Sequence, residues 1–196
     1  MNSNDLAKFK RAHRIAIGEE TTAKDRAQAF IIWRELSEMG YIRSTFYLGV
    51  CFDNGFGTRI NRPKAFEAYL RAARDGHSDA QYNIYQMYSR GVGTEKNLHK
   101  AIRWLRESAR NRETEAIRDL GYCYHEGNGV RKNYAKAAQL YKSAAKANDA
   151  IAQWNLALCY EDGHGVRQSQ RWSTYWMRKA AKNGHRKALA YVSRKA

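Results

Sequence analysis

Glycine, aromatic and small residues recur along the chain at a constant step of 36 residues. Four Gly-x-Gly pairs keep this step and begin at Gly55, Gly91, Gly127 and Gly163. An aromatic residue stands three places before each pair, at Phe52, Tyr88, Tyr124 and Tyr160. Small residues keep the same step in further columns, of which one is Ala73, Ala109, Ala145 and Ala181. A fixed period in this range predicts a stack of repeated structural units.

The polar and capping positions predict a pair of helices in each unit. Residues that favour a helix N-cap form one column, which is Asp25, Asn61, Asn97, Asn133 and Ser169. The ends expected for these helices fall at Gly40, Gly76, Arg112, Asn148 and Gly184. Glycine and asparagine there suit a left-handed C-terminal cap, so Arg112 predicts a looser end. We expect first helices (A helices) at 42–53, 78–89, 114–125 and 150–161, and second helices (B helices) at 61–75, 97–111, 133–147 and 169–183.

The two ends of the chain depart from this pattern, as terminal repeats do. An earlier helix pair, at about 3–17 and 25–39, lacks the Gly-x-Gly pair. The tail predicts one more A helix, and no linker or domain boundary is visible. We therefore expect a single all-α domain over 1–196. Its parts are a degenerate repeat at 1–41, repeats at 42–77, 78–113, 114–149 and 150–185, and a capping helix at 186–196.

Several segments resemble the Sel-1-like repeat (SLR), a relative of the tetratricopeptide repeat. Examples are "LGYCYHEGNGVRKNYAKAAQLYKSAAKAND" and "AQWNLALCYEDGHGV" followed by "YWMRKAAKNGH". The pattern A-x-x-x-L-G-x-x-Y, G-x-G-V, K-A and A-A covers about 40–185, although Tyr85 and Ala157 replace the glycine of Leu-Gly and Trp172 replaces a lysine. The resemblance implies a right-handed α-solenoid that binds other proteins as a non-enzymatic adaptor. A protein that blocks a toxin is one specialised form of that role.

Composition adds a strong positive charge to this picture. The formal net charge is +16, which favours an acidic protein, a nucleic acid or an anionic membrane surface as partner. No apolar run approaches the length of a membrane span, and the first residues lack the apolar core of a signal peptide. These features predict a cytoplasmic protein.

Candidate chemistry is sparse. The Gly-x-Gly pairs follow predicted helices rather than strands, so we interpret them as turns and not as phosphate-binding loops. Cys51, Cys123 and Cys159 share one column, and helix spacing keeps equivalent positions too far apart for a disulfide. Neither a nucleophile motif, a metal cluster nor a carboxylate pair is visible. We therefore expect no enzyme activity, no cofactor and no metal.

Two surfaces are candidates for binding. In related helix-pair repeats the A helices line a concave groove, and the groove columns place Phe46, Tyr82, Gln86, Arg118, Tyr122, His125, Trp154 and Leu158 on it. Aromatic and arginine side chains commonly anchor interfaces, which favours a partner segment in this groove. The alternative is an anionic partner on a basic stripe of the B helices, which contains Arg74, Arg106, Arg110, Lys142, Lys146, Arg178 and Lys182. Such cations also complement helix C-termini, and no aromatic column accompanies them.

Overall fold

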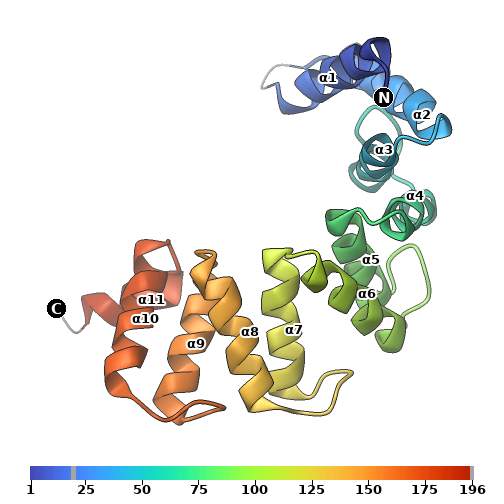
Figure 1. Ribbon diagram of the computed structural model, residues 1–196. Helices are drawn as coiled ribbons and strands as arrows, with labels where there is room; N and C mark the ends of the chain where they lie inside the picture. Colours follow the sequence, from blue (N-terminus) through green and yellow to red (C-terminus); the bar gives the residue numbers. More distant parts are fainter. Residues whose placement is uncertain (19–20, 195–196) are drawn as a thin grey trace. The chain divides into compact units, whose positions relative to one another are not determined.

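The structure is a computed structural model that describes residues 1–18 and 21–194 (Figure 1). Helices are the only regular elements in these ranges. The first pair is α1 (Ser3–Ile17) and α2 (Ala23–Glu38). The A helices are α3 (Ile42–Asn54), α5 (Ser78–Arg90), α7 (Thr114–Glu126) and α9 (Ala150–Asp162), and α11 (Arg186–Ser193) ends the series. The B helices are α4 (Arg62–Arg74), α6 (Leu98–Arg110), α8 (Tyr134–Lys146) and α10 (Gln170–Lys182). The predicted helix pairs are confirmed to within two residues at each end.

The chain forms two compact units, Met1–Trp104 and Leu105–Ala196, and α6 crosses from one to the other. In the first unit, α2 packs against α1 and α3, and α4 packs against α3 and α5. In the second unit, α8 packs against α7 and α9, and α10 packs against α9 and α11. Within each unit these helices therefore pack against their neighbours in the sequence, as expected of stacked repeats. That the chain is one solenoid domain divided at the predicted boundaries stays a prediction.

The predicted N-caps of the B helices are confirmed in the four full repeats. The side chains of Asn61, Asn97 and Asn133 accept hydrogen bonds from N–H groups three residues later, at 2.9–3.0 Å, and Ser169 does so at 3.4 Å. The prediction for Asp25 is wrong, because α2 begins at Ala23 and its N-cap lies three residues before Asp25. Thr22 is the cap of that helix, and its hydroxyl accepts from the Asp25 N–H while the Asp25 carboxylate accepts from the Thr22 N–H. This capping box satisfies two helix donors at once, which a lone Asp25 cap would not do.

The ends of the B helices share one left-handed geometry. Gly76 has a φ of 90° and Asn148 a φ of 66°, and Arg112 adopts the same region with a φ of 63°. The looser end predicted at Arg112 is therefore wrong. The Glu113 N–H donates to the Ser108 carbonyl at 3.2 Å, just as the His77 N–H donates to the Ala72 carbonyl at 3.0 Å. The hydrogen bonds of this cap hold Arg112 in a conformation that its side chain disfavours.

The Gly-x-Gly pairs are turns, as predicted. The first glycine ends each A helix in the left-handed region, with φ values of 73–79°. The second glycine lies against the backbone of the preceding helix pair. A Cβ atom on Gly165 would stand 2.1 Å from the Tyr134 carbonyl oxygen, and one on Gly57 would stand 2.1 Å from the Arg26 carbonyl oxygen. The turn therefore lets successive repeats pack closely, and this packing explains the glycines without any ligand.

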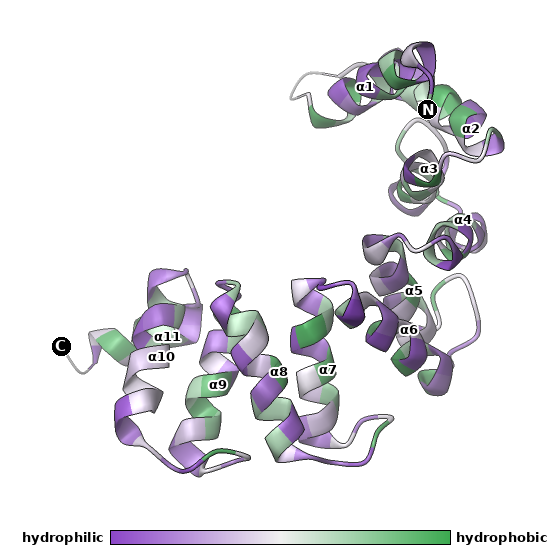
Figure 2. Cartoon of the chain, viewed as in Figure 1, coloured by the Kyte–Doolittle hydropathy of each residue, from purple (hydrophilic) through white to green (hydrophobic). Residues whose placement is uncertain are grey.

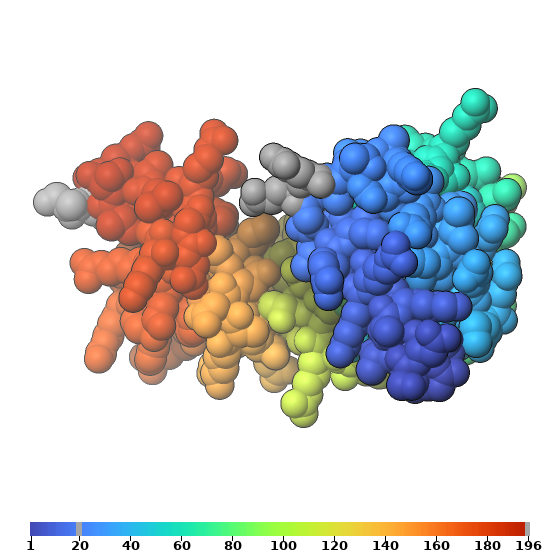
Figure 3. All heavy atoms as spheres, turned by 90° about the horizontal axis from the view of Figure 1, so that it is seen from above, coloured from blue at the N-terminus to red at the C-terminus, as the bar shows by residue number. Residues whose placement is uncertain are grey.

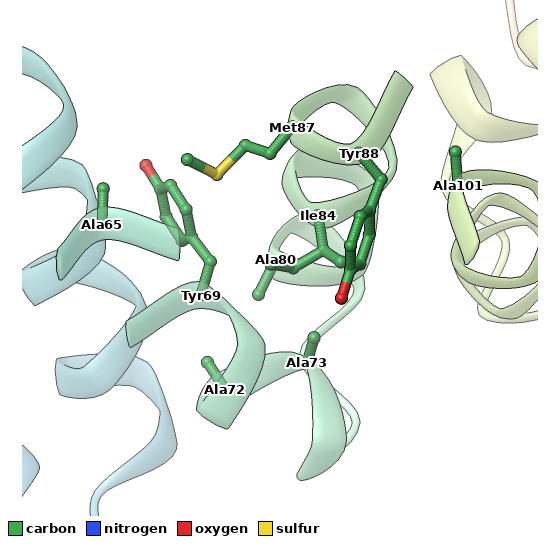
Figure 4. Packing of buried hydrophobic residues seen from close by; sticks show 9 residues of the cluster. All are labelled: Ala65, Tyr69, Ala72, Ala73, Ala80, Ile84, Met87, Tyr88 and Ala101. Atoms are coloured by element: carbon green, nitrogen blue, oxygen red, sulfur yellow. The ribbon is translucent and has the colours of Figure 1, made fainter. Parts of the chain in front are cut away.

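Small residues and large ones alternate in the core. Figure 4 shows Tyr69 of α4 and Ile84, Met87 and Tyr88 of α5 among alanines that bring the backbones together. Gly49 of α3 faces the Tyr69 ring so closely that an added Cβ would lie 2.6 Å from it. Apolar residues extend over most of α9, whereas hydrophilic residues dominate α10 (Figure 2). The A helices thus contribute much of the core, and the B helices present more charge.

The three cysteines lie in this core as unpaired thiols, as predicted. Burial raises the pKa of Cys51 to about 12 and of Cys123 and Cys159 to about 11. Because the thiolate is the reactive form, these side chains act as small hydrophobic residues.

Candidate functional site

The structure places every predicted groove residue on an A helix. Phe46 lies on α3; Tyr82 and Gln86 on α5; Arg118, Tyr122 and His125 on α7; Trp154 and Leu158 on α9. Tyr122 is the most exposed of them, with 52% of its surface accessible, while the others are half-buried. Tyr122 is therefore the one predicted groove residue whose side chain is exposed, and the others are partly packed against the rest of the fold.

Three of these residues contact the N-cap of the next A helix, 31 positions later in the sequence. The Phe46 ring stacks on His77 with centroids 4.3 Å apart, and the Trp154 ring stacks on His185 at 4.9 Å. At the equivalent place, the Arg118 Nη1 atom lies 2.9 Å from the Asp149 Oδ2 atom. This contact couples neighbouring repeats. This contact was not predicted from the sequence. The signal that could have shown it is a spacing of 31 residues between an aromatic residue and a histidine, or between opposite charges.

The cap residues in these pairs also start the helices. The His77 and His185 imidazoles accept hydrogen bonds from the Ala80 and Ala188 N–H groups through Nδ1, and the Asp149 carboxylate accepts from the Ala152 N–H. Burial lowers the pKa of His77, and the nearby Arg43 lowers it further, while Asp79 opposes the shift. Burial and Lys187 likewise lower the pKa of His185. A lowered pKa favours the neutral imidazole, which is the form that can accept from a helix N–H group.

A cleft of about 1140 Å³ opens in the first unit between α1, α3 and the start of α5. Its lining includes the predicted anchor Phe46, and its other walls come from residues that the sequence analysis did not select. Among these are Leu6, Phe9, Lys10, His13 and Arg14 of α1, and Arg43 and Tyr47 of α3. The degenerate first repeat thus forms one wall of this cleft. This wall was not predicted, because the first repeat departs from the pattern and the groove residues were chosen from columns of the four full repeats.

Aromatic rings fix one another at the floor of this cleft. The Tyr47 ring stacks on the buried Trp33 ring with centroids 4.9 Å apart. The same ring meets Phe9, His13 and Phe46 edge-on at 5.4–5.7 Å. Offset and edge-on contacts of this kind hold side chains in defined positions. The cleft therefore has a preformed apolar floor.

In the second unit, the histidines near the turns pack on one tyrosine. His164 stacks on Tyr134 with ring centroids 4.3 Å apart, and the His125 ring lies 5.0 Å from the same tyrosine. The His125 Nδ1 atom also lies 2.8 Å from the Glu126 Oε1 atom. His125 and His164 are both half-buried, so the contact with Tyr134 accounts for much of their placement.

The basic stripe is exposed along its whole predicted length. Its members lie on α4 (Arg74), α6 (Arg106 and Arg110), α8 (Lys142 and Lys146) and α10 (Arg178 and Lys182). Arg110 pairs with Glu107 at 2.6 Å. Two aromatic side chains accompany the stripe on α10, where Trp172 and Tyr175 are 47% and 44% exposed. Figure 3 shows the second unit from above, with side chains of the C-terminal helices (orange-red to red) projecting from its surface.

The α10 surface forms a shallow depression of about 620 Å³. Its lining residues are Gln170, Arg171, Thr174, Tyr175, Arg178, Lys179 and Lys182. The helix contains no aspartate or glutamate, so its cations meet no carboxylate on their own element. Arg178 and Lys182 of this surface were predicted as part of the basic stripe. Trp172 and Tyr175 were missed because they have no aromatic counterparts in the other repeats.

The fold and these surfaces define a class of protein, the helix-pair repeat scaffolds with a 36-residue unit. The Sel1 repeat model matches residues 42–77, 78–112, 114–149 and 150–185. The chain belongs to the Sel1 repeat family. Proteins of this family generally act as non-enzymatic scaffolds that bind other proteins. No helix in the described part of the chain is long and apolar enough to cross a membrane.

Solved structures support the fold. A protective antigen of uropathogenic Escherichia coli with an SLR fold matches 94% of this chain with a TM-score of 0.87 and 28% identity, and the match spans 39% of that protein. A Sel1 repeat protein of Oxalobacter formigenes matches 96% of this chain and 76% of its own length, with a TM-score of 0.84 and 29% identity. An immunity protein of Pseudomonas aeruginosa matches 96% of this chain and 69% of its own, with a TM-score of 0.60 and 16% identity, and shows the fold alone. A comparison with curated protein sequences finds no match. The predicted all-α solenoid class is confirmed.

Proposed function

We propose that this chain is a non-enzymatic interaction module that holds a segment of a partner protein against its A-helix faces. The observation that carries the proposal is the cleft of about 1140 Å³ in the first unit, which has a preformed aromatic floor. A preformed apolar surface binds without a large ordering cost, and aromatic side chains dominate the energy of protein interfaces.

The predicted groove residues take different parts in this function. Tyr122 and Leu158 of the second unit, with Tyr82 and Gln86 of the first, supply contact surface on their A helices. Phe46, Arg118 and Trp154 are each held by the N-cap of the next A helix, so their side chains are positioned before a partner arrives. Positioned aromatic and arginine side chains are the types found at hot spots. His125 lies at the end of α7 and adds a polar contact at the edge of the surface.

One protein with a similar fold, from Pseudomonas aeruginosa, is an immunity protein. A partner that this chain would neutralise is therefore one form of the proposed role. The argument is an analogy of fold.

Exposed positions on the two A-helix faces allow a test that leaves the core intact. Leu6→Ser changes the rim of the first cleft, and Tyr122→Ala changes α7. Matched controls are Ile60→Ser and Tyr175→Ala, which are also exposed, at 59% and 44%, but lie away from these faces. Each variant is immobilised, and bound proteins are quantified by mass spectrometry against the wild type. Thermal melting confirms that every variant folds.

We expect the wild type and both controls to retain the same partner, and one of the face variants to lose it by about tenfold or more, because a hot-spot truncation costs about 2 kcal/mol. A partner that both face variants retain fully would show that binding uses another surface.

A second function is favoured by the α10 surface. Trp172 and Tyr175 are exposed beside Arg171, Arg178 and Lys182, and this combination suits single-stranded nucleic acid, in which bases stack on aromatic rings and cations track the backbone. Titration of a fluorescent single-stranded oligonucleotide at rising salt tests it. Four neutralised phosphates would give a slope of log affinity against log salt near −2.8, and Trp172→Ala would weaken binding. Equal binding by Trp172→Ala and the wild type, or no binding at low salt, would remove this function.

A further inference from the structure

We infer that the cleft of the first unit takes a partner segment in which a carboxylate lies next to an aromatic or aliphatic side chain. This inference rests on the proposed function and specifies the chemistry of the segment. It concerns only the cleft between α1, α3 and the start of α5.

The apolar half of the recognition comes from the floor and rim of the cleft. Phe9, Phe46 and Tyr47 form the ring-packed floor. Leu6 and Ile17 of α1 also line the cleft, and both are largely exposed, at 42% and 70%. An aliphatic or aromatic side chain of a partner would cover apolar surface that now faces water, which gains about 25 cal/mol for each Å² buried.

The charged half comes from three cations that line the same cleft. Lys10 and Arg14 lie on α1, and Arg43 lies at the start of α3. None of the three forms an ion pair among residues 1–18 and 21–194, and all are exposed. Among the described residues that line the cleft, Asp79 is the one carboxylate. The cleft therefore presents an excess of positive charge to an incoming segment.

The acidic residue of α1 does not offset this charge. Asp5 is the one carboxylate in α1, and it is buried with 3% of its surface accessible. It accepts a hydrogen bond of 2.7 Å from the Tyr41 hydroxyl, which holds α1 against the start of α3. The charged side chains that α1 exposes are therefore all cations, namely Lys10, Arg11 and Arg14.

The size and charge of the cleft select a peptide segment with an acidic group. A volume of about 1140 Å³ lies above the range of about 300–1,000 Å³ that holds most small ligands, so several residues of an extended segment fit better. The guanidinium groups of Arg14 and Arg43 present planar forks that match a carboxylate. The net charge of +16 would also steer an acidic partner to the surface.

A library of random linear peptides displayed on phage tests the inference, with the wild-type chain as bait. The enriched peptides are synthesised and their affinities measured by fluorescence anisotropy. Arg14→Glu/Arg43→Glu reverses the charge of the cleft, and Leu6→Ser alters its apolar rim. The matched control is Arg59→Glu/Arg103→Glu, which changes the net charge equally at exposed sites outside the cleft.

We expect the enriched peptides to carry Asp or Glu beside Phe, Tyr, Trp, Leu or Ile. Their affinity should fall by about tenfold or more with the cleft double variant and change little with the control. Replacing the acidic residue of the peptide by its amide should cause a similar loss.

The possible failures are distinguishable. In one outcome, the peptides lose affinity for Leu6→Ser but contain no acidic residue, or they bind Arg14→Glu/Arg43→Glu as well as the wild type. This outcome would overturn the inference and leave the proposed function standing. Enrichment of peptides that none of the cleft variants weakens, or no enrichment at all, would overturn the inference together with the proposed function of this cleft. Equal losses in the cleft variant and the control would show non-specific attraction and would also overturn the inference.

Discussion

At the scale of single residues, the two helices of a repeat can pack a small residue of the A helix against a large residue of the B helix. The sequence pattern showed the two columns but not that they face each other. Gly49 and Gly121 stand opposite the rings of Tyr69 and Tyr141, where added Cβ atoms would lie 2.6 and 2.9 Å away. Where Ala157 replaces this glycine in the second unit, the tyrosine position is taken by Met177. The sequence showed this substitution, but it could not show which facing residue compensates for it. That pairing depends on how the two helices of a unit cross.

This pairing predicts a coupled effect of substitution. Gly49→Ala forces a Cβ onto the Tyr69 ring, so we expect a loss of about 1–2 kcal/mol despite the better helix propensity of alanine. In Gly49→Ala/Tyr69→Met, which copies Ala157 and Met177, the loss should be smaller than the sum of the two single losses by about 1 kcal/mol or more. Urea unfolding of the four proteins in the cycle measures this. Strictly additive losses would mean that the ring does not limit the size of residue 49.

At the scale of the elements, helix starts were easier to predict than the contacts between helices. Asn61, Asn97, Asn133 and Ser169 cap as predicted because capping depends on chemistry within three residues. The prediction for Asp25 was wrong because, in the degenerate first repeat, Thr22 supplies the cap three residues earlier and Asp25 takes the third position of the helix. The looser end predicted at Arg112 was also wrong. There the hydrogen bonds of the cap hold the backbone in the left-handed region, although an arginine disfavours that region.

The strained end at Arg112 predicts a stabilising substitution. Arg112→Gly should raise the free energy of unfolding by about 1 kcal/mol, because a φ of 63° costs an arginine energy that glycine does not lose. Asn148→Gly has the same geometry and serves as a comparison. It should gain less, because asparagine tolerates the left-handed region. Urea denaturation measures both, and a loss of stability in Arg112→Gly would show that the arginine side chain makes a favourable contact.

The histidine caps predict a dependence of stability on pH. The pKa of His77 is lowered from its ordinary value near 6.5, so the unfolded chain binds more protons than the folded chain just below that value. The stability from this neutral cap is complete above about pH 7 and falls as the pH drops through the ordinary value. His77→Asn keeps a cap without this titration, so its thermal midpoint should fall less between about pH 7.5 and 5.5 than that of the wild type.

The comparison for this prediction is His99→Asn at an exposed position on α6. It should follow the wild-type pH dependence. If His77→Asn loses as much thermal stability on acidification as the wild type does, protonation of the cap is not the cause.

At the scale of the whole molecule, the repeat period allowed most of the fold to be predicted but only part of the site. The columns correctly placed Phe46, Tyr122 and Trp154 on A helices, because each repeat presents equivalent positions on the same face. The wall formed by α1 was missed, since Lys10 and Arg14 belong to a repeat that lacks the Gly-x-Gly turn. Surfaces built from the ends of a solenoid depend on residues that no column contains.

The central claim is that partners bind on the A-helix faces. Hydroxyl-radical footprinting of the chain, alone and with a captured partner, reports the solvent exposure of individual side chains on both faces. We expect a bound partner to lower the oxidation of Tyr122, or of Leu6 and Tyr47 in the first cleft, while Trp172 and Tyr175 of α10 stay as reactive as in the unbound chain. Protection of Trp172 and Tyr175 with no change at Leu6, Tyr47 or Tyr122 would contradict it.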